Sequence, residues 1–531
     1  MRLPLRTLAL VSALGLAVAG CSGGEVRRPA ASSAPAAPTA PFVYAFNLDV
    51  ITNWDPATSS SNEIIALQNV YETLTKYNPE TRKAEPRLAV SWTASPDGRG
   101  WTFKLREGAK FHTGKPVDAA AVKASIERTR KMAGYAAYIW DSVKAIQVVN
   151  PTTVRFSLSY PAPLDLIASA GYGAYVYDTT AAGRGDLKAW FAEGRDAGSG
   201  PYTVGTWEKG RETELTLKAF DDYWGGWKDP GHYRDVRFRV TPEETTAWQL
   251  LKRGEVGFME RVSPQLFAQA PADGVQTSET SSFQNLLVLF NTESTDVRVR
   301  RAVQKAIDYQ GLVTAAKGSI VLGGGLVPEG LLGHVPGDPP AQDLAGAEAL
   351  LREAGYGPGG RELTLRMTFA QGDSDQQLLT TLLGSALSKL NVKLEAAPLQ
   401  WSAQWDQGKA KDPSKRQDIF VMYWFPDYAD AYSWFNNVFR SAENVEFNLS
   451  YLKDPAVDAK IDTLPELTAT DRAAAEKAYG ELQATLIDER AAVAVPYVQR
   501  YRRAYLGGVQ GYVDNPAYPN VVFFHDLRAG R

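Results

Sequence analysis

The chain reads Pro86-Arg-Leu-Ala-Val-Ser-Trp92, then Ser95-Pro-Asp-Gly98, then Trp101-Thr-Phe-Lys-Leu-Arg106. In the third segment Trp101, Phe103 and Leu105 alternate with polar residues, which is the pattern of a half-buried strand. The second segment has turn chemistry, because Pro presets φ and Gly tolerates positive φ. This region therefore predicts a turn followed by a strand that has one apolar face.

Strand and helix patterns alternate irregularly on both sides of this region. The alternation predicts strands over 43–50, 153–160, 214–220 and 236–240, and helical spacing predicts helices over 63–74, 378–390 and 471–487. Asp343 is suited to cap a helix over 344–354 that Gly355 ends. A chain of 531 residues is too long for one hydrophobic core, so these elements predict an α/β protein with two lobes.

An aromatic segment follows the apolar run that starts at Asp418. It reads Tyr423-Trp-Phe-Pro-Asp427-Tyr-Ala-Asp430-Ala-Tyr-Ser-Trp-Phe435. Rings beside an acid at a strand end suit a ligand that is cationic at one point and apolar elsewhere. Aromatic residues are mostly packing residues, however, and both acids could cap the next helix. The segment alone leaves both interpretations open.

The composition excludes some classes of partner and site. With 44% hydrophobic and 22% charged residues the chain reads as ordinary globular protein, and a net charge of −3 offers no general basic field for nucleic acid. Its one cysteine, Cys21, excludes an intramolecular disulfide and a thiolate-cluster metal site. We find no HExxH or GxSxG motif and no Cys/His metal spacing, so we predict no enzyme, no cofactor and no metal. Asp and Glu pairs alone do not rule out a glycosidase-like dyad.

The first 41 residues have the layout of an exported and tethered protein. Residues 1–20 combine a basic start, a short apolar middle and small residues, which is typical of a secretory signal. Val18-Ala-Gly-Cys21 resembles the bacterial lipoprotein box, in which Cys becomes the acylated N-terminus; a plain signal peptide that contains a Cys is the alternative. Residues 21–41, rich in Ala, Pro and Ser, predict a flexible tether. We therefore expect a lipid-anchored, extracytoplasmic protein at the cell membrane.

The opening region, continued to His112-Thr-Gly-Lys-Pro116, closely resembles the signature of the extracellular solute-binding proteins of peptide- and nickel-type ABC importers. Further matches follow in that family's order. They are Gly198 to Tyr202, Phe220 to Gly226, Phe290-Asn291, Asp296 to Ala302, Ala306 to Asp308, Ala347 to Tyr356, and Asn448 to Asp458. The resemblance covers the chain from Phe42 to its C-terminus.

The resemblance implies a periplasmic-binding-protein-like clamshell of type II, with an extra subdomain in its first lobe. By analogy, lobe I comprises 42–77, 195–292 and 490–531, the extra subdomain 78–194, and lobe II 293–489. The segments around Trp92, Trp101 and His112 are then scaffold, because Pro and Gly fix turns and the indoles pack.

The resemblance also gives the aromatic segment a role. Asp427 occupies the position of the family's acid that pairs with the α-amino group of the ligand, while Asp430 is expected to be structural. Trp424 and Tyr428 are expected to line the cleft, although core packing is the alternative for both. Asn291 completes the predicted ligand-binding set.

One departure bears on the ligand. Dipeptide binders place an Arg for the ligand carboxylate in a region that here reads Phe369-Ala-Gln-Gly-Asp-Ser-Asp375, without Arg. A longer peptide or a non-peptide solute is thus favoured over a strict dipeptide, and no His near Asp427 supports a nickel complex.

We predict a monomeric receptor that delivers an oligopeptide to an ABC permease and its ATPase. The alternatives are a sugar, a metal complex or another small solute in the same fold, a ligand sensor instead of a transport subunit, and an anchored hydrolase.

Overall fold

The computed structural model describes residues 38, 40–46, 53–209, 211–337 and 339–530. The predicted signal, Cys21 and nearly all of the predicted tether lie outside these residues. Within the described ranges, no helix combines the length and the apolar character that crossing a bilayer requires.

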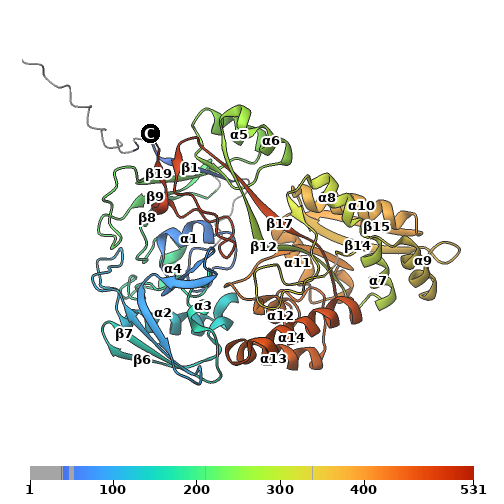
Figure 1. Ribbon diagram of the computed structural model, residues 1–531, viewed down its shortest axis with the longest axis horizontal. Helices are drawn as coiled ribbons and strands as arrows, with labels where there is room; N and C mark the ends of the chain where they lie inside the picture. The colour runs from blue at the N-terminus through green and yellow to red at the C-terminus, as the bar shows by residue number, and fades with distance from the viewer. Residues whose placement is uncertain (1–37, 39, 47–52, 210, 338, 531) are drawn as a thin grey trace, which may run out of the picture.

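Two lobes lie side by side and share one large mixed sheet (Figure 1). Among the described residues this sheet has 11 strands, ordered β15-β14-β16-β12-β17-β11-β1-β10-β9-β8, with β13 beside β17. The strands from β11 to β8 belong to lobe I, and those from β15 to β16 belong to lobe II. Of the strands in the described ranges, only β12 and β17 run through both lobes.

Lobe I is built on β1, which pairs in parallel with β10 and β11. Its core includes Tyr44, Phe238 and Phe258, whose rings contact one another. The elements of lobe I are β1 (Phe42–Phe46), α1 (Ile64–Val70), β2 (Thr75–Asn78), β3 (Lys83–Pro86), α4 (Leu187–Ala192), β8 (Tyr202–Trp207), β9 (Thr213–Ala219), β10 (Asp235–Val240), α5 (Glu244–Lys252), β11 (Phe258–Met259), α6 (Pro264–Asp273), β18 (Val509–Gln510), η4 (Phe524–Asp526) and β19 (Arg528–Ala529). Two of them, β3 and α4, fall within the range 78–194 predicted for the subdomain, but β3 pairs with β2 and Phe191 of α4 is buried in the core of lobe I.

The extra subdomain has its own four-stranded sheet, in the order β4-β5-β7-β6, and its own core. In β5 the alternation predicted from sequence is confirmed, since Phe103 and Leu105 are buried while Trp101 stacks on Phe103 at 6.2 Å. The elements are β4 (Ala89–Ala94), β5 (Gly100–Leu105), α2 (Ala119–Met132), the 3₁₀ helix η1 (Tyr135–Trp140), β6 (Val143–Asn150), β7 (Thr153–Leu158) and α3 (Leu164–Ile167).

Lobe II places helices on both faces of its sheet. Along β12, Leu286 and Val288 face the core formed with α7 to α10, and Leu287 and Leu289 face the core shared with α12 to α14. The elements are α7 (Val297–Ala306), α8 (Tyr309–Ala316), β13 (Ile320–Val321), α9 (Leu344–Glu353), β14 (Leu363–Ala370), α10 (Ser374–Ser388), β15 (Val392–Leu399), α11 (Trp401–Gly408), η2 (Pro413–Lys415), β16 (Ile419–Trp424), α12 (Tyr432–Val438), α13 (Pro455–Thr470), α14 (Arg472–Ala484) and a π-helical turn η3 (Thr485–Glu489).

The two connections between the lobes are β12 (Gln276–Phe290) and β17 (Val493–Tyr505), which pair with each other antiparallel (Figure 1). Their register shifts between Ser281 and Asn285, so a bulge lies midway between the lobes. Ser282 there donates its hydroxyl to the carbonyl of Gln499 at 2.6 Å. The lobe boundaries predicted at 292/293 and 489/490 thus lie at the lobe II end of these strands.

Most local predictions fit, and one helix is shorter than expected. Asp343 accepts from the backbone N–H of Gly346 at 2.8 Å, as predicted for the cap of α9. The helix predicted over 63–74 ends at Val70, because the carbonyl of Val70 accepts from Gly200 at 2.9 Å and Tyr71 is extended. The segment from Gly198 to Tyr202 thus contacts the end of α1, and this tertiary contact ends the helix before its sequence pattern does.

Candidate ligand-binding cleft

A cavity of about 380 Å³ lies between the two lobes. Its lining is rich in charge and comes from both lobes and from the crossover strand β17. The charged lining residues are Glu243, Glu244, Glu260 and Arg261 of lobe I, Asp373 and Asp375 of lobe II, and Arg500, Arg502 and Arg503 of β17. A cavity of this size between two lobes is suited to a small solute or part of a longer one.

The topology of lobe II brings two acidic loops to one edge of the sheet. Strands β14 and β16 are parallel neighbours, so their carboxyl ends meet at the same edge. Asp373 follows β14 and caps α10, and Asp427 follows β16. Tyr423 in β16 joins the two, since its hydroxyl lies 3.3 Å from Asp373 Oδ1. Crevices at the carboxyl ends of strands are the usual ligand sites of open α/β sheets.

The carboxylate of Asp427 is buried at the contact between the lobes, with 1% of the residue exposed. The hydroxyl of Tyr135 lies 3.0 and 3.1 Å from its two oxygens, and Tyr138 donates to Oδ2 at 2.5 Å. Asn437 of α12 donates to Oδ2 at 3.1 Å. Both tyrosines belong to η1 of the subdomain, so the acid of lobe II is held by donors of lobe I.

Aromatic rings contact the two tyrosines that donate to this carboxylate. The ring of Tyr135 is 4.4 Å from that of Phe447 and meets Trp424 edge-on at 6.3 Å. The ring of Tyr138 is 6.1 Å from that of Tyr432. These rings and the acid form an aromatic box, which is an environment that stabilises an organic cation.

Burial raises the pKa of Asp427 to about 6, although its bonds to Tyr138, Tyr135 and Asn437 oppose the shift. The carboxylate has no cation as a partner among the described residues; its donors are neutral hydroxyl and amide groups. An ammonium group at this point would supply the missing positive charge and lower the pKa again.

The other members of the predicted set fall into different environments. Trp424 is buried in the aromatic box and donates its indole N–H to Ser433 at 3.3 Å. Tyr428 is buried in the core of the subdomain, across the interface between the lobes. Asp430 accepts from Tyr479 at 3.0 Å and from the N–H of Tyr432 at 2.8 Å, which is a structural arrangement. Neither Asp427, Trp424 nor Tyr428 lines the cavity itself.

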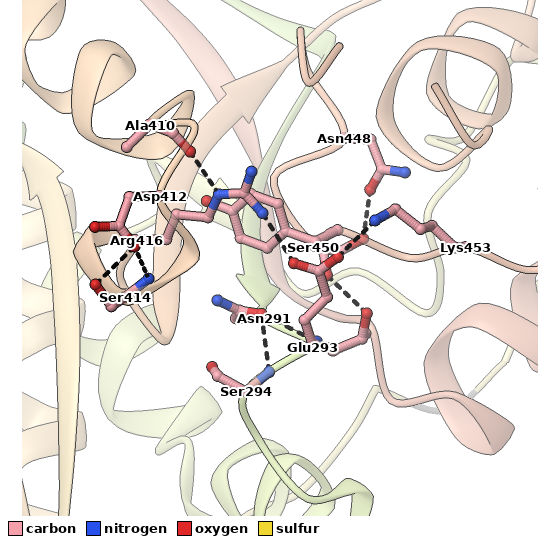
Figure 2. A network of polar contacts seen from close by, with 12 residues as sticks. Asn291, Glu293, Ser294, Ala410, Asp412, Ser414, Arg416, Asn448, Ser450 and Lys453 are labelled. Carbon is pink, nitrogen blue, oxygen red and sulfur yellow. Dashed lines mark hydrogen bonds and ion pairs between the residues drawn. The ribbon is translucent and has the colours of Figure 1, made fainter. Parts of the chain in front are cut away.

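Asn291 lies in a separate polar network of lobe II, shown in Figure 2. Its amide oxygen accepts from the N–H groups of Glu293 and Ser294, and its amide nitrogen donates to the carbonyl of Gln417 at 3.0 Å. Arg416 and Lys453 pair with Glu293 at 2.8 and 2.7 Å in the same network. The predicted ligand contact of Asn291 therefore gains no support from its position, which is that of a scaffold residue.

The segment 369–375 contains no Arg, but the guanidinium group of an arginine from elsewhere in the chain lies beside this segment. Arg261 of lobe I, which follows β11, is 3.7 Å from Asp373 across the cleft. The sequence analysis missed Arg261, Tyr135, Tyr138 and Asn437. A pair of tyrosines three residues apart in an aromatic-rich subdomain was the only local signal that could have found two of them.

Two lobes joined by paired strands, with a polar cavity and a buried acid between them, define a binding protein that encloses a solute. Residues 83–446 match the family profile described as bacterial extracellular solute-binding proteins, family 5, middle region. The chain belongs to this family.

Relatives and solved structures agree with this assignment. The chain is 27% identical over 486 residues to the probable D,D-dipeptide-binding periplasmic protein DdpA of Escherichia coli. The matched region covers 88% of this chain and 90% of that protein. DppA of Helicobacter pylori in complex with the peptide STSA has a TM-score of 0.79 at 21% identity, covering 92% and 98% of the two chains. NikA of Brucella suis in complex with Fe(III)-EDTA has a TM-score of 0.76 at 23% identity, covering 92% and 99%. The predicted α/β clamshell is confirmed.

Proposed function

We propose that this chain is the substrate-binding component of an ABC importer, and that it captures an oligopeptide between its lobes. Family membership and the peptide named for DdpA and for the Helicobacter complex support this proposal. The importer's permease and ATPase are the proposed partners, and the chain performs no chemistry of its own. We propose a monomer that has no nucleic-acid partner.

The observation that carries the proposal is the aromatic box around Asp427. Asp427 pairs with the α-amino group of the peptide, and the hydroxyls of Tyr135 and Tyr138 turn from donors into acceptors for the ammonium protons. Trp424 covers the amine by a cation–π contact, and Tyr428 fixes the loop that carries Asp427 against the subdomain. The remainder of the peptide extends toward the cavity at Asp373.

Closure is the proposed transport signal. The bulge at Ser282 in the paired crossover strands is suited to bend as lobe I and its subdomain separate from lobe II. In the open form Tyr135 and Tyr138 move away from Asp427, so an ammonium group can reach it. Ligand binding then favours the closed form, and this form docks on the permease.

We further propose that Cys21 carries the lipid anchor and holds the receptor at the outer face of a membrane, in the periplasm or outside a single membrane. The support is the lipoprotein box and the tether of residues 21–41 in the sequence.

A second candidate keeps the fold and changes the solute to a sugar, a metal complex or another small molecule, and the NikA complex with Fe(III)-EDTA favours it. A ligand sensor is the third candidate, which neighbouring permease and ATPase genes would distinguish from a transport subunit.

Native mass spectrometry of the protein purified without added ligand tests the proposal. A ladder of retained peptide masses that vanishes on denaturation is the expected result, and N-acetylated peptides should not compete for binding. One discrete non-peptide mass would instead favour the second candidate and remove Asp427 from its assigned role.

A further inference from the structure

The guanidinium groups that line the cavity differ in how they are bonded. Arg500 and Arg502 both donate to Glu279, at 2.8 and 2.7 Å, and Arg503 donates to Asp514 at 2.9 Å. Arg261 is the exception among the described residues of the lining. Arg261 makes no hydrogen bond to any residue that the structure describes. The acid that pairs with it, Asp373, is 3.7 Å away.

An arginine has five N–H donors in a planar fork that matches a carboxylate. The side chain of Arg261 is 50% exposed, and it lines the cavity, so this accessible surface faces space that a solute can fill. A charged donor set that is accessible from the cavity and has no bonded acceptor is suited to an anion.

We propose that Arg261 binds a carboxylate of the solute and thereby selects ligands that carry a free acid group. This inference rests on the proposed function and deepens it, because the acid group lies in the cavity and the amine lies in the separate box at Asp427. The solute then carries opposite charges at two points, and each charge is recognised from a different lobe.

Asp373 is the acid that lies beside Arg261 in the cleft. Its Oδ1 accepts from the N–H groups of Asp375 and Gln376 and from Tyr423, whereas the ion pair with Arg261 runs through Oδ2. At 3.7 Å this pair is too long for a hydrogen bond, so a ligand carboxylate that bonds the fork directly would displace it.

Two of the other acids that line the cavity, Glu260 and Asp375, are weakened as competitors for Arg261. Glu260 accepts from the hydroxyl of Tyr44 at 3.0 Å, which turns one of its oxygens toward lobe I. Burial, and secondarily the charge of Asp373, raises the pKa of Asp375. Its neutral form is therefore more populated than that of an ordinary carboxyl group.

The test compares two pools of random tripeptides, one with free C-terminal carboxylates and one with C-terminal amides. The full chain in a mild detergent is equilibrated with each pool, and native mass spectrometry measures the retained peptide. We expect the free-acid pool to be retained about tenfold better or more. Arg261→Gln should make the two pools equal, whereas Asp373→Asn, which keeps the Oδ1 cap, should preserve or increase the preference.

Arg253→Gln is the matched control, since Arg253 is a half-exposed arginine of the same lobe that pairs with Glu255 outside the cavity. It should behave as the unmodified chain does. Equal retention of both pools by the unmodified chain would overturn the inference. So would an Arg261→Gln variant that weakens both pools alike, which would make Arg261 only a contact between the lobes. If neither pool were retained, the proposed peptide-binding function would fail too. This outcome differs from equal retention of both pools, which would contradict only the role of Arg261.

Discussion

Tyr135 places its hydroxyl 3.0 and 3.1 Å from the two carboxylate oxygens of Asp427, although 292 residues separate them in the chain. One residue belongs to the subdomain of lobe I and the other to lobe II. The backbone of Asp427 is bonded across the same interface, since the N–H of Gly171 donates to its carbonyl at 2.9 Å. Under the proposed function, ligand recognition and lobe closure would therefore involve the same side chain.

Replacing Asp427 with Asn should weaken the binding of peptides that have a free amine by about 1.4 kcal/mol or more, roughly tenfold. The amide keeps the shape of the side chain and removes the charge that pairs with the ammonium. Isothermal calorimetry measures the effect. The control is Asp430→Asn, because Asp430 is also buried but, among the residues that the structure describes, bonds only to Tyr479 and the N–H of Tyr432. Unchanged affinity of the Asp427 variant would remove this acid from the site.

Replacing Tyr135 and Tyr138 with Phe should shift the ligand-free protein toward an open form. Each hydroxyl donates across the interface to a buried carboxylate, and hydrogen bonds to charged groups contribute about 1.5–3 kcal/mol each. Small-angle X-ray scattering should then report a larger radius of gyration. Tyr432→Phe removes a hydroxyl that bonds within α12, to Asn436, and should leave the scattering unchanged. Equal curves for all variants would show that these bonds do not hold the lobes together.

Peptide binding should weaken as the pH falls through about 6. The carboxyl of Asp427 has a pKa raised to about 6 by burial, and only its ionised form attracts an ammonium group. Below that pH the free protein must lose a proton before it binds, so affinity should drop about tenfold per pH unit. Calorimetry between pH 5 and 8 measures this dependence. The Asp427→Asn variant should lack it, and a pH profile that persists in the variant would assign the titration to another group.

Local sequence patterns predicted the elements whose stability is itself local. The cap at Asp343 depends on a residue three positions away, and the strand from Trp101 to Leu105 pairs with β4, which directly precedes it; both are present. The helix predicted over 63–74 ends at Val70 because Gly200, far away in the chain, bonds to the carbonyl of Val70. The apolar periodicity of a segment does not indicate that a distant residue will bond to its backbone and end the helix.

The candidate site was predictable only in part, for the same reason. Asp427 stood out because an acid among aromatic residues follows an apolar strand, and because the segment resembles one of a known family. Arg261 has no aromatic neighbours of this kind, and the pair of Tyr135 and Tyr138 does not indicate which acid it meets. The fold brings Tyr138 to Asp427 from another lobe, and it brings Arg261 to Asp373 in the same way.

His112, which was predicted from the sequence to be a scaffold residue, bonds to two acceptors in the structure. Its Nδ1 bonds to the carboxylate of Asp196 and its Nε2 lies 2.9 Å from the carbonyl of Gly200. Since both partners are acceptors, both ring nitrogens donate and the ring is protonated. Burial by itself would lower the pKa of His112, but the charge of Asp196 and the bonds to Asp196 and Gly200 together raise it.

A raised folded-state pKa gives stability that is fully present below the ordinary pKa of histidine and is lost as the pH rises through the folded value. His112→Gln should therefore lower the free energy of unfolding by about 2 kcal/mol at pH 6, and by less at pH 9. Urea denaturation at the two pH values measures the difference. His334→Gln is the control, because within the described part of the chain the ring of His334 makes one hydrogen bond, to the backbone carbonyl of Val327. A loss of stability that is the same at both pH values would show that His112 acts by packing against Phe220 rather than by its charge.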